Sequence, residues 1–183
     1  MREKEGFHFG RISMINHWTI AVVFISVLSL GFYLNFVGSG RGLRGPWMGV
    51  HQAAGVVFLG LALWRISWRF LQGFPQDSAP MPAWQKLSAK LVHWVLLFVI
   101  VAMPVSGIVM SLFSERAINV FGLFTLQALP ENELITRIAG GLHWWLSYLV
   151  LGALFLHVGA VLKHHFIDKD DTLRRMISTK KKE

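Results

Sequence analysis

Two histidines toward the C-terminal end of the chain, His143 and His157, have the type and spacing that metal or haem ligation requires. They are 14 residues apart, and at about 100° per residue a helix of that length brings both side chains to one face. At about 1.5 Å rise per residue they lie roughly 21 Å apart, while the hydrocarbon core of a bilayer is about 30 Å thick. One spanning helix would therefore carry an imidazole near each side of a membrane, which is what a two-haem electron carrier needs.

Three further histidines, His17, His51 and His93, lie in apolar segments. Depth along the segments pairs His51 with His143 on the external side and His17 with His157 on the cytoplasmic side. Two imidazoles on one iron suit electron transfer rather than oxygen binding. His93 is a fifth intramembrane histidine, and it stays open as a contact for a quinone or a haem propionate, or as the cytoplasmic ligand in place of His17.

Two glycines have the same 14-residue relation to a histidine. Gly31 follows His17 and Gly107 follows His93 by that interval, so each faces the level of the external haem. Small residues leave room for a flat macrocycle, although they also let helices approach each other when no cofactor is present. Both glycines are therefore candidate haem-packing residues.

Arg65 lies 14 residues after His51 and so points toward the cytoplasmic haem. A charged side chain at that depth is costly unless it has a partner. A haem propionate would be a suitable partner. The alternative is that the side chain extends to the membrane surface and anchors the helix there.

The apolar stretches that carry these residues are long enough to cross a membrane. The chain is 54% hydrophobic and 15% charged, whereas soluble domains are about 25% charged. The stretches that reach the roughly 20 residues of a spanning helix are 12–37, 48–71, 87–113 and 138–165. The sequence thus predicts an all-α integral membrane four-helix bundle with haem sites in its core. We expect a single domain over residues 1–176 and a charged cytoplasmic tail over residues 177–183. The last fifteen or so residues are charged and are expected to be solvated.

The longest connection, residues 114–137, contains an apolar segment of its own. Val120–Leu129 is far too short to span a bilayer. We expect it to form a surface or re-entrant segment.

Positive residues indicate the orientation, because cytoplasmic loops are enriched in Lys and Arg. The side assigned to the cytoplasm carries Arg2, Lys4, Arg11, Arg65, Arg69, Lys86, Lys90, Lys163, Lys169, Arg174, Arg175 and Lys180–Lys182. Both termini are therefore expected to be cytoplasmic. Because the net charge of +8 sits beside apolar spans, it predicts contact with membrane lipids and no nucleic-acid partner. The external side carries Arg41, Arg44, Arg116 and Arg137 against Glu115, Glu131 and Glu133. Arg41 and Arg44 give the first external loop a positive charge, which would attract an anion.

The residue types that are absent narrow the chemistry. The chain has no cysteine, which excludes covalent attachment of a c-type haem and cysteine-ligated iron–sulfur clusters. The four apolar stretches contain no Asp or Glu. Metal and proton transporters usually combine buried histidines with carboxylates, so a transporter is disfavoured.

Several motifs resemble the bacterial cytochrome b-561 family over nearly the whole chain. The motifs are Asn16–Trp18, His51–Gly55, Met103–Met110, Leu142–Trp145 and Leu162–Met176. The resemblance implies a four-helix inner-membrane protein with two b-type haems and electron exchange with the ubiquinone pool. The axial-ligand histidines of the family correspond to His17, His51, His143 and His157.

One branch of that family is a superoxide oxidase, which passes an electron from periplasmic superoxide to ubiquinone. If the chain acts in this way, Arg41 and Arg44 would draw in the anion. A quinone near the cytoplasmic haem would have as candidate contacts Arg65, Arg69, Lys86, Lys90, His93 and His164. The alternative is a cytochrome b subunit that serves a separate dehydrogenase or a periplasmic redox partner.

Overall fold

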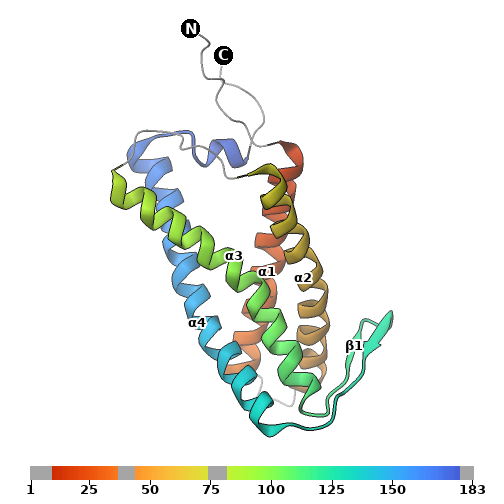
Figure 1. The fold of residues 1–183 in the computed structure, drawn as a ribbon. Coiled ribbons are helices and arrows are strands. Elements are labelled where there is room, and N and C mark those ends of the chain that lie inside the picture. Colours follow the sequence, from red (N-terminus) through yellow and green to blue (C-terminus); the bar gives the residue numbers. More distant parts are fainter. Residues whose placement is uncertain (1–9, 37–43, 74–81, 178–183) are drawn as a thin grey trace.

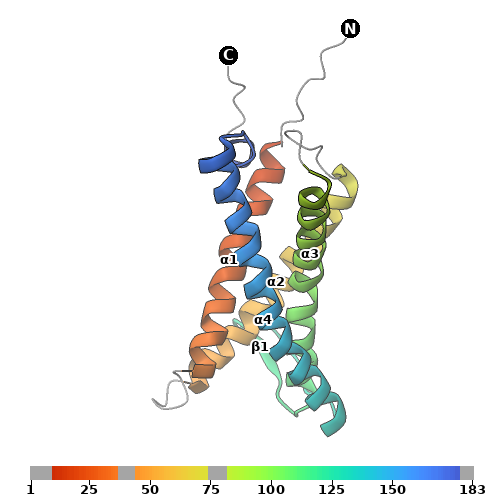
Figure 2. The same ribbon diagram turned by 90° about the vertical axis from the view of Figure 1, so that its left-hand side faces the viewer.

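The fold is a bundle of four long helices (Figures 1 and 2). The computed structural model describes residues 10–36, 44–73 and 82–177. Within them, α1 spans Arg11–Phe36, α2 Arg44–Gln72, α3 Ala83–Leu112 and α4 Glu133–Lys163. All four are long and apolar enough to cross a membrane. The predicted all-α membrane bundle is therefore confirmed, although α2, α3 and α4 begin four or five residues earlier than the hydropathy of the sequence indicated.

Local sequence explains where some of these helices begin. Asn132 caps α4, because its side-chain oxygen accepts a hydrogen bond of 3.1 Å from the amide of Ile135, and Glu133 in the first turn complements the helix dipole. Pro46 is in the first turn of α2, where the missing amide proton costs little. Pro104 is instead buried inside α3, where it removes one backbone hydrogen bond.

The interior of the bundle is apolar and close-packed between its two ends. The rings of Phe24 and Phe58 stack there with centres 5.0 Å apart, and Val99 and Val150 are fully buried. Large apolar side chains also point outward, as Val22 and Phe155 do. An apolar outside as well as an apolar inside is what a helix bundle in lipid requires.

A β-hairpin lies in the connection between α3 and α4. Strands β1 (Ile118–Val120) and β2 (Phe124–Leu126) pair antiparallel, with Val120 opposite Phe124. Phe121 and Gly122 have positive φ values of 51° and 78°, and Gly122 adopts this backbone without the steric cost of a side chain. We call the end of the bundle that carries the hairpin the hairpin end. The terminal end is the one where α1 begins and α4 ends.

The chain continues beyond α4 with a π-helical turn, His164–Asp168, and a 3₁₀ turn, Arg174–Met176. The indole nitrogen of Trp18 donates a hydrogen bond of 2.7 Å to the carbonyl oxygen of Met176. The expectation of a solvated tail was therefore wrong for the residues up to Met176, which fold back onto α1. Residues 178–183 of that tail lie outside the described residues.

Candidate functional site

The hairpin end of the bundle holds one pair of facing histidines. His51 on α2 and His143 on α4 have ring centres 6.2 Å apart, with planes at 87°. Metal–imidazole bonds of about 2 Å would place the centres of two imidazoles on opposite sides of one metal about 6 Å apart. The separation of these two rings therefore fits a single iron held between them.

Gly31 and Gly107 pack directly against the two rings. A Cβ built on Gly31 would lie 3.0 Å from Cε1 of His51, and one built on Gly107 would lie 3.0 Å from Cε1 of His143. Such contacts are too short for a carbon atom to be accepted without movement of the ring. The glycines therefore allow the imidazoles to lie against the backbones of α1 and α3, a more specific role than leaving general space for a macrocycle.

A cavity of about 280 Å³ lies around this histidine pair. Its lining includes Gly31, Gly55, Gly107 and Gly140, together with apolar and aromatic side chains from all four helices. Most of the lining is apolar, and the two imidazoles are part of it. This is the composition of a cofactor site in a helix bundle, and the residues present fit a haem.

Two groups on α3 hold the His143 ring. Nδ1 of His143 is 2.9 Å from the carbonyl oxygen of Met103 and 3.1 Å from Oγ of Ser106. The Ser106 hydroxyl donates to the same carbonyl at 2.8 Å. Because a carbonyl only accepts, Nδ1 carries the proton, and Nε2 keeps its lone pair for a metal. Sequence reasoning missed this role, although a serine two residues after a proline in an apolar helix was a signal.

The His51 ring is less completely hydrogen-bonded. Its Nδ1 is buried and makes no hydrogen bond of good geometry to any described residue, although it interacts with the backbone of Val27. Buried polar groups in folded proteins are nearly always paired. An incompletely paired imidazole that faces a second imidazole is consistent with a ligand site.

The terminal end brings together three histidines. The ring centre of His157 on α4 lies 6.3 Å from that of His17 on α1 and 5.5 Å from that of His93 on α3. The first separation nearly equals that of the pair at the hairpin end. Both candidates for the second ligand therefore lie next to His157.

Arg65 makes contacts with protein groups in this cluster. Its Nη1 donates to Oδ1 of the fully buried Asn16 at 3.3 Å, and its Nη2 is 3.4 Å from Nδ1 of His17. A guanidinium can only donate, so Nδ1 of His17 is the acceptor in this contact. The partners of Arg65 are thus the imidazole of His17 and the side chain of Asn16. The arginine is close enough to the histidines to pair with an anionic group bound among them.

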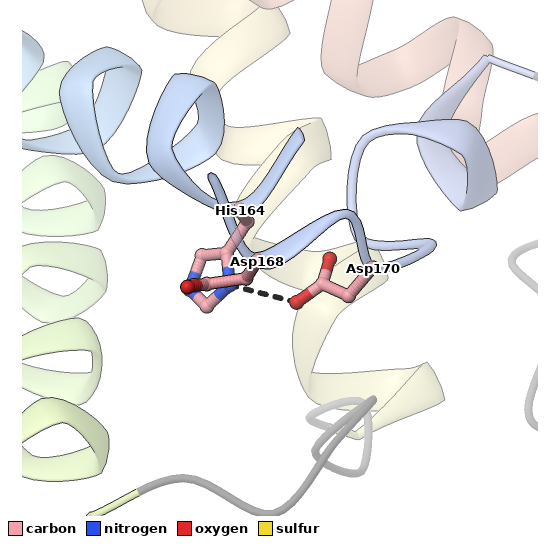
Figure 3. A group of neighbouring side chains, drawn as sticks. All are labelled: His164, Asp168 and Asp170. Atoms are coloured by element: carbon pink, nitrogen blue, oxygen red, sulfur yellow. Dashed lines mark hydrogen bonds and ion pairs between the residues drawn. The ribbon is translucent and has the colours of Figure 1, made fainter. Parts of the chain in front are cut away.

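The residues after α4 form a polar cluster (Figure 3). Nδ1 of His164 lies 2.7 Å from Oδ2 of Asp170 and 3.1 Å from Oδ2 of Asp168. Lys163 also binds Asp168, at 2.6 Å, and the amide of Thr172 donates to Asp170. Partial burial opposes ionisation of Asp170, but the hydrogen bonds from Thr172 and His164 outweigh it and lower the pKa of Asp170 below its ordinary value.

This cluster has the donor types of a cation site, with three donor atoms within 4.8 Å of one another. Its carboxylates are already bound to Lys163, His164 and Thr172. We call this group of residues the clamp, because its bonds join the end of α4 to the turn that leads back to α1. His164, a predicted quinone contact, is part of that clamp.

The other predicted quinone contacts are spread over the terminal end. Arg69 donates to the carbonyl oxygen of Gly73 at 3.3 Å, whereas Lys86 and Lys90 are exposed on the first turns of α3. An apolar groove lies nearby between α1 and the folded C-terminal segment. The groove is lined by Met14, Ile15, Trp18, Thr19, Met176 and Ile177. The predicted external residues Arg41 and the side chain of Arg44 lie outside the part of the chain that the structure describes.

The chain is similar in sequence to known membrane cytochromes. A family model described as prokaryotic cytochrome b561 matches residues 8–179. Cytochrome b561 homolog 2 of Escherichia coli K12 is 31% identical over 92% of this chain and 90% of its own length. Cytochrome b561 homolog 1 of the same organism is 27% identical over 94% of this chain and 98% of its own length.

A third relative is the probable superoxide oxidase CybB of Yersinia pestis, which is 31% identical over 74% of this chain and 78% of its own length. The family model and the first of these relatives cover nearly all of the four-helix bundle. The histidine pairs and the glycines that pack on them lie within the matched residues. The chain therefore belongs to the prokaryotic cytochrome b561 family of bacterial membrane cytochromes with b-type haem.

Proposed function

We propose that this protein carries electrons across the bacterial inner membrane, between an external redox partner and ubiquinone, with two bis-histidine haem b groups. The observation that carries the proposal is the equal spacing of two histidine pairs at opposite ends of one bundle, 6.2 Å for His51 and His143 and 6.3 Å for His17 and His157. When bound, each haem would supply a one-electron redox centre.

Helix α4 links the two sites. Its buried residues Leu146, Val150 and Ala153 lie between His143 and His157 at helical spacing, so they share the face of the two ligands. This face packs into the apolar core and excludes water from the interval between the sites. The chain thereby keeps the two redox centres at a fixed separation in a medium of low polarity.

At the terminal end, either His17 or His93 could be the second haem ligand beside His157. The ring spacing favours His17 as the partner of His157, because 6.3 Å is close to the expected separation and the 5.5 Å to His93 is short. The contact of Arg65 with His17 favours His93 instead. A ligating imidazole normally donates a hydrogen bond from the ring nitrogen that does not bind the metal, whereas Nδ1 of His17 accepts one from Arg65. We assign His17 as the ligand and His93 as a neighbour that contacts a propionate or a quinone, with Arg65 available to bind a propionate.

Quinone binding is assigned to the terminal end. The groove beside Trp18 and Met176 is apolar and lies on the helix that carries His17, so it suits a lipid-soluble ring and its tail. His93, Arg65 and Arg69 would supply polar contacts on the inner side of the cluster. With this assignment both termini face the cytoplasm, in agreement with the excess of positive residues around them.

Superoxide is the external substrate that we favour. It would give up one electron and leave as dioxygen, and two such events would reduce one quinone to the quinol with two protons from water. The relative from Yersinia pestis that is named a probable superoxide oxidase supports this choice, as do the external Arg41 and Arg44, which would attract an anion.

The test uses the purified, haem-loaded protein with superoxide and a soluble ubiquinone analogue. Reduction of the quinone by superoxide, with no other protein present, is the expected result. If superoxide leaves the haems oxidised, the protein is instead a cytochrome subunit that depends on a separate dehydrogenase or periplasmic partner.

A further inference from the structure

The β-hairpin rises alongside the bundle and leans outward from it, instead of extending beyond its end. In both views its tip is level with the spanning helices, above the lower ends of α3 and α4, and in Figure 1 the strands rise beside α2. Because the two views share their vertical axis, this height does not depend on the viewing direction. The hairpin is therefore at the depth of the helices that cross the membrane.

The root of the hairpin is fixed against the bundle. Ile118 and Val120 are buried, and Ile118 lines the same cavity as His51 and Gln52. His51 is the eighth residue of α2, about 10 Å along the helix from its first residue. This contact holds β1 at the level of the hairpin-end histidine pair.

The tip carries the opposite pattern. Leu123 is 81% exposed, and Phe121 and Phe124 are also more than half exposed. Residues 117–130 contain no charged side chain, whereas Glu115, Arg116 and Glu131 flank them directly. An uncharged apolar tip between charged bases matches a segment whose bases are in water and whose tip is in lipid.

The polar groups of the tip are largely satisfied within it. The amide of Gly122 donates to Oδ1 of Asn119 at 2.7 Å, and the amide of Leu123 donates to the carbonyl oxygen of Val120 at 3.0 Å. The two strands pair with each other. Internal pairing lowers the cost of moving the turn out of water, since lipid offers no hydrogen bonds.

From this pattern we infer that the tip of the hairpin, Phe121–Phe124, is a membrane anchor that inserts into the interfacial layer of the leaflet at the hairpin end. Its partner is the lipid, and the same insertion holds Ile118 against the cavity around His51 and His143. The inference concerns the connection between α3 and α4 and does not depend on electron transfer or on the identity of the substrate.

The absence of cysteine from the chain makes the experiment direct. A nitroxide spin label is attached to Leu123→Cys in protein reconstituted into vesicles of phosphatidylethanolamine and phosphatidylglycerol. Collisions with oxygen, which concentrates in lipid, are compared with collisions with a water-soluble nickel chelate. Val57→Cys, on the exposed face of α2, is the lipid reference, and Glu131→Cys, in the exposed connection before α4, is the water reference.

The expected result is that the Leu123 label collides preferentially with oxygen, as the Val57 label does. Preference for the nickel chelate, as at Glu131, would overturn the inference. Low accessibility to both reagents would overturn it as well, because the tip would then be covered by another protein chain. If Leu123→Cys does not assemble, Phe124→Cys reports on the same surface.

Discussion

The imidazole of His143 donates from Nδ1 to the backbone carbonyl oxygen of Met103, 2.9 Å away on a different helix. This bond connects residues 40 positions apart in the sequence and fixes both the tautomer and the direction of the ring. Ser106 donates to the same carbonyl and lies 3.1 Å from the ring nitrogen. The motif around Pro104 on α3 therefore orients a proposed haem ligand on α4.

The Ser106→Ala substitution should weaken the hairpin-end haem site without removing it. Removal of a group that orients a metal-binding histidine typically costs about 10–100-fold in affinity, and the carbonyl of Met103 remains, so we expect a loss near 10-fold. A haem titration of the purified apoprotein, with a redox titration of both haems, measures it. Ser26→Ala is the matched control, since its hydroxyl donates within its own helix, to the carbonyl oxygen of Val22. Equal effects of the two substitutions would contradict an orienting role.

Gly31→Ala and Gly107→Ala should each disturb the hairpin-end site selectively. The new methyl group would lie 3.0 Å from the ring of His51 or His143, so that ring must move away from its position. We expect loss of about one haem per chain, read from pigment content at equal protein concentration. Gly60→Ala is the control, because a Cβ there meets no atom within 4 Å and alanine favours the helix by roughly 0.5–1 kcal/mol. Full haem content in both variants would count against a ligand role for the rings.

The choice between His17 and His93 can be decided by paired substitutions. His17→Ala should remove the terminal-end haem, whereas His93→Ala should keep it and change its potential or the quinone kinetics. The physical basis is the 6.3 Å separation of His17 from His157. Low-temperature difference spectra, which resolve the two haems, provide the measurement. Loss of a haem in His93→Ala and its retention in His17→Ala would reverse the assignment.

The clamp after α4 should depend on pH through Asp170. Its pKa is lowered in the folded protein by hydrogen bonds from Thr172 and His164, so ionised Asp170 stabilises the turn. That stabilisation is fully present above the ordinary aspartate pKa of about 3.9 and is lost as the pH falls through the lowered pKa. Asp170→Asn should therefore speed hydrogen exchange of residues 164–177 at pH 7.

The control for this clamp is Asp171→Asn, since Asp171 pairs only loosely, at 3.5 Å, with the exposed Arg174. This variant should exchange like the unmodified protein. If Asp170→Asn exchanges no faster than Asp171→Asn, the side chain of Asp170 contributes nothing to the order of the segment.

The sequence predicted the features that depend on length and depth. Runs of apolar residues without Asp or Glu predict spanning helices, and the positions of His51 and His143 relative to the helix ends are enough to place them at one level. Gly31 was assigned to that level by its 14-residue interval from His17, and it does contact the His51 ring. Helical periodicity fixes such relations within one helix.

Features that depend on the rotation and packing of helices could not be predicted. His17 and His93 enter the bundle on different helices at similar depth, and only the tertiary structure shows that both contact His157. The roles of Met103 and Ser106 require α3 and α4 to be packed together. The apolar segment 120–129 was recognised, but two strands of three residues each are too short for periodicity to reveal.

The most direct test of the central claim is the haem content of the purified protein and of its His51→Ala and His143→Ala variants, with reduced-minus-oxidised spectra of all three. We predict two b-type haems per chain in the unmodified protein. Each variant should contain one, with the spectrum of the remaining haem unchanged. Retention of both haems in either variant would contradict the pairing of His51 with His143 across the bundle. The pairing would also be contradicted if a His157→Ala variant lost the same haem, identified by its spectrum, as the His51→Ala and His143→Ala variants.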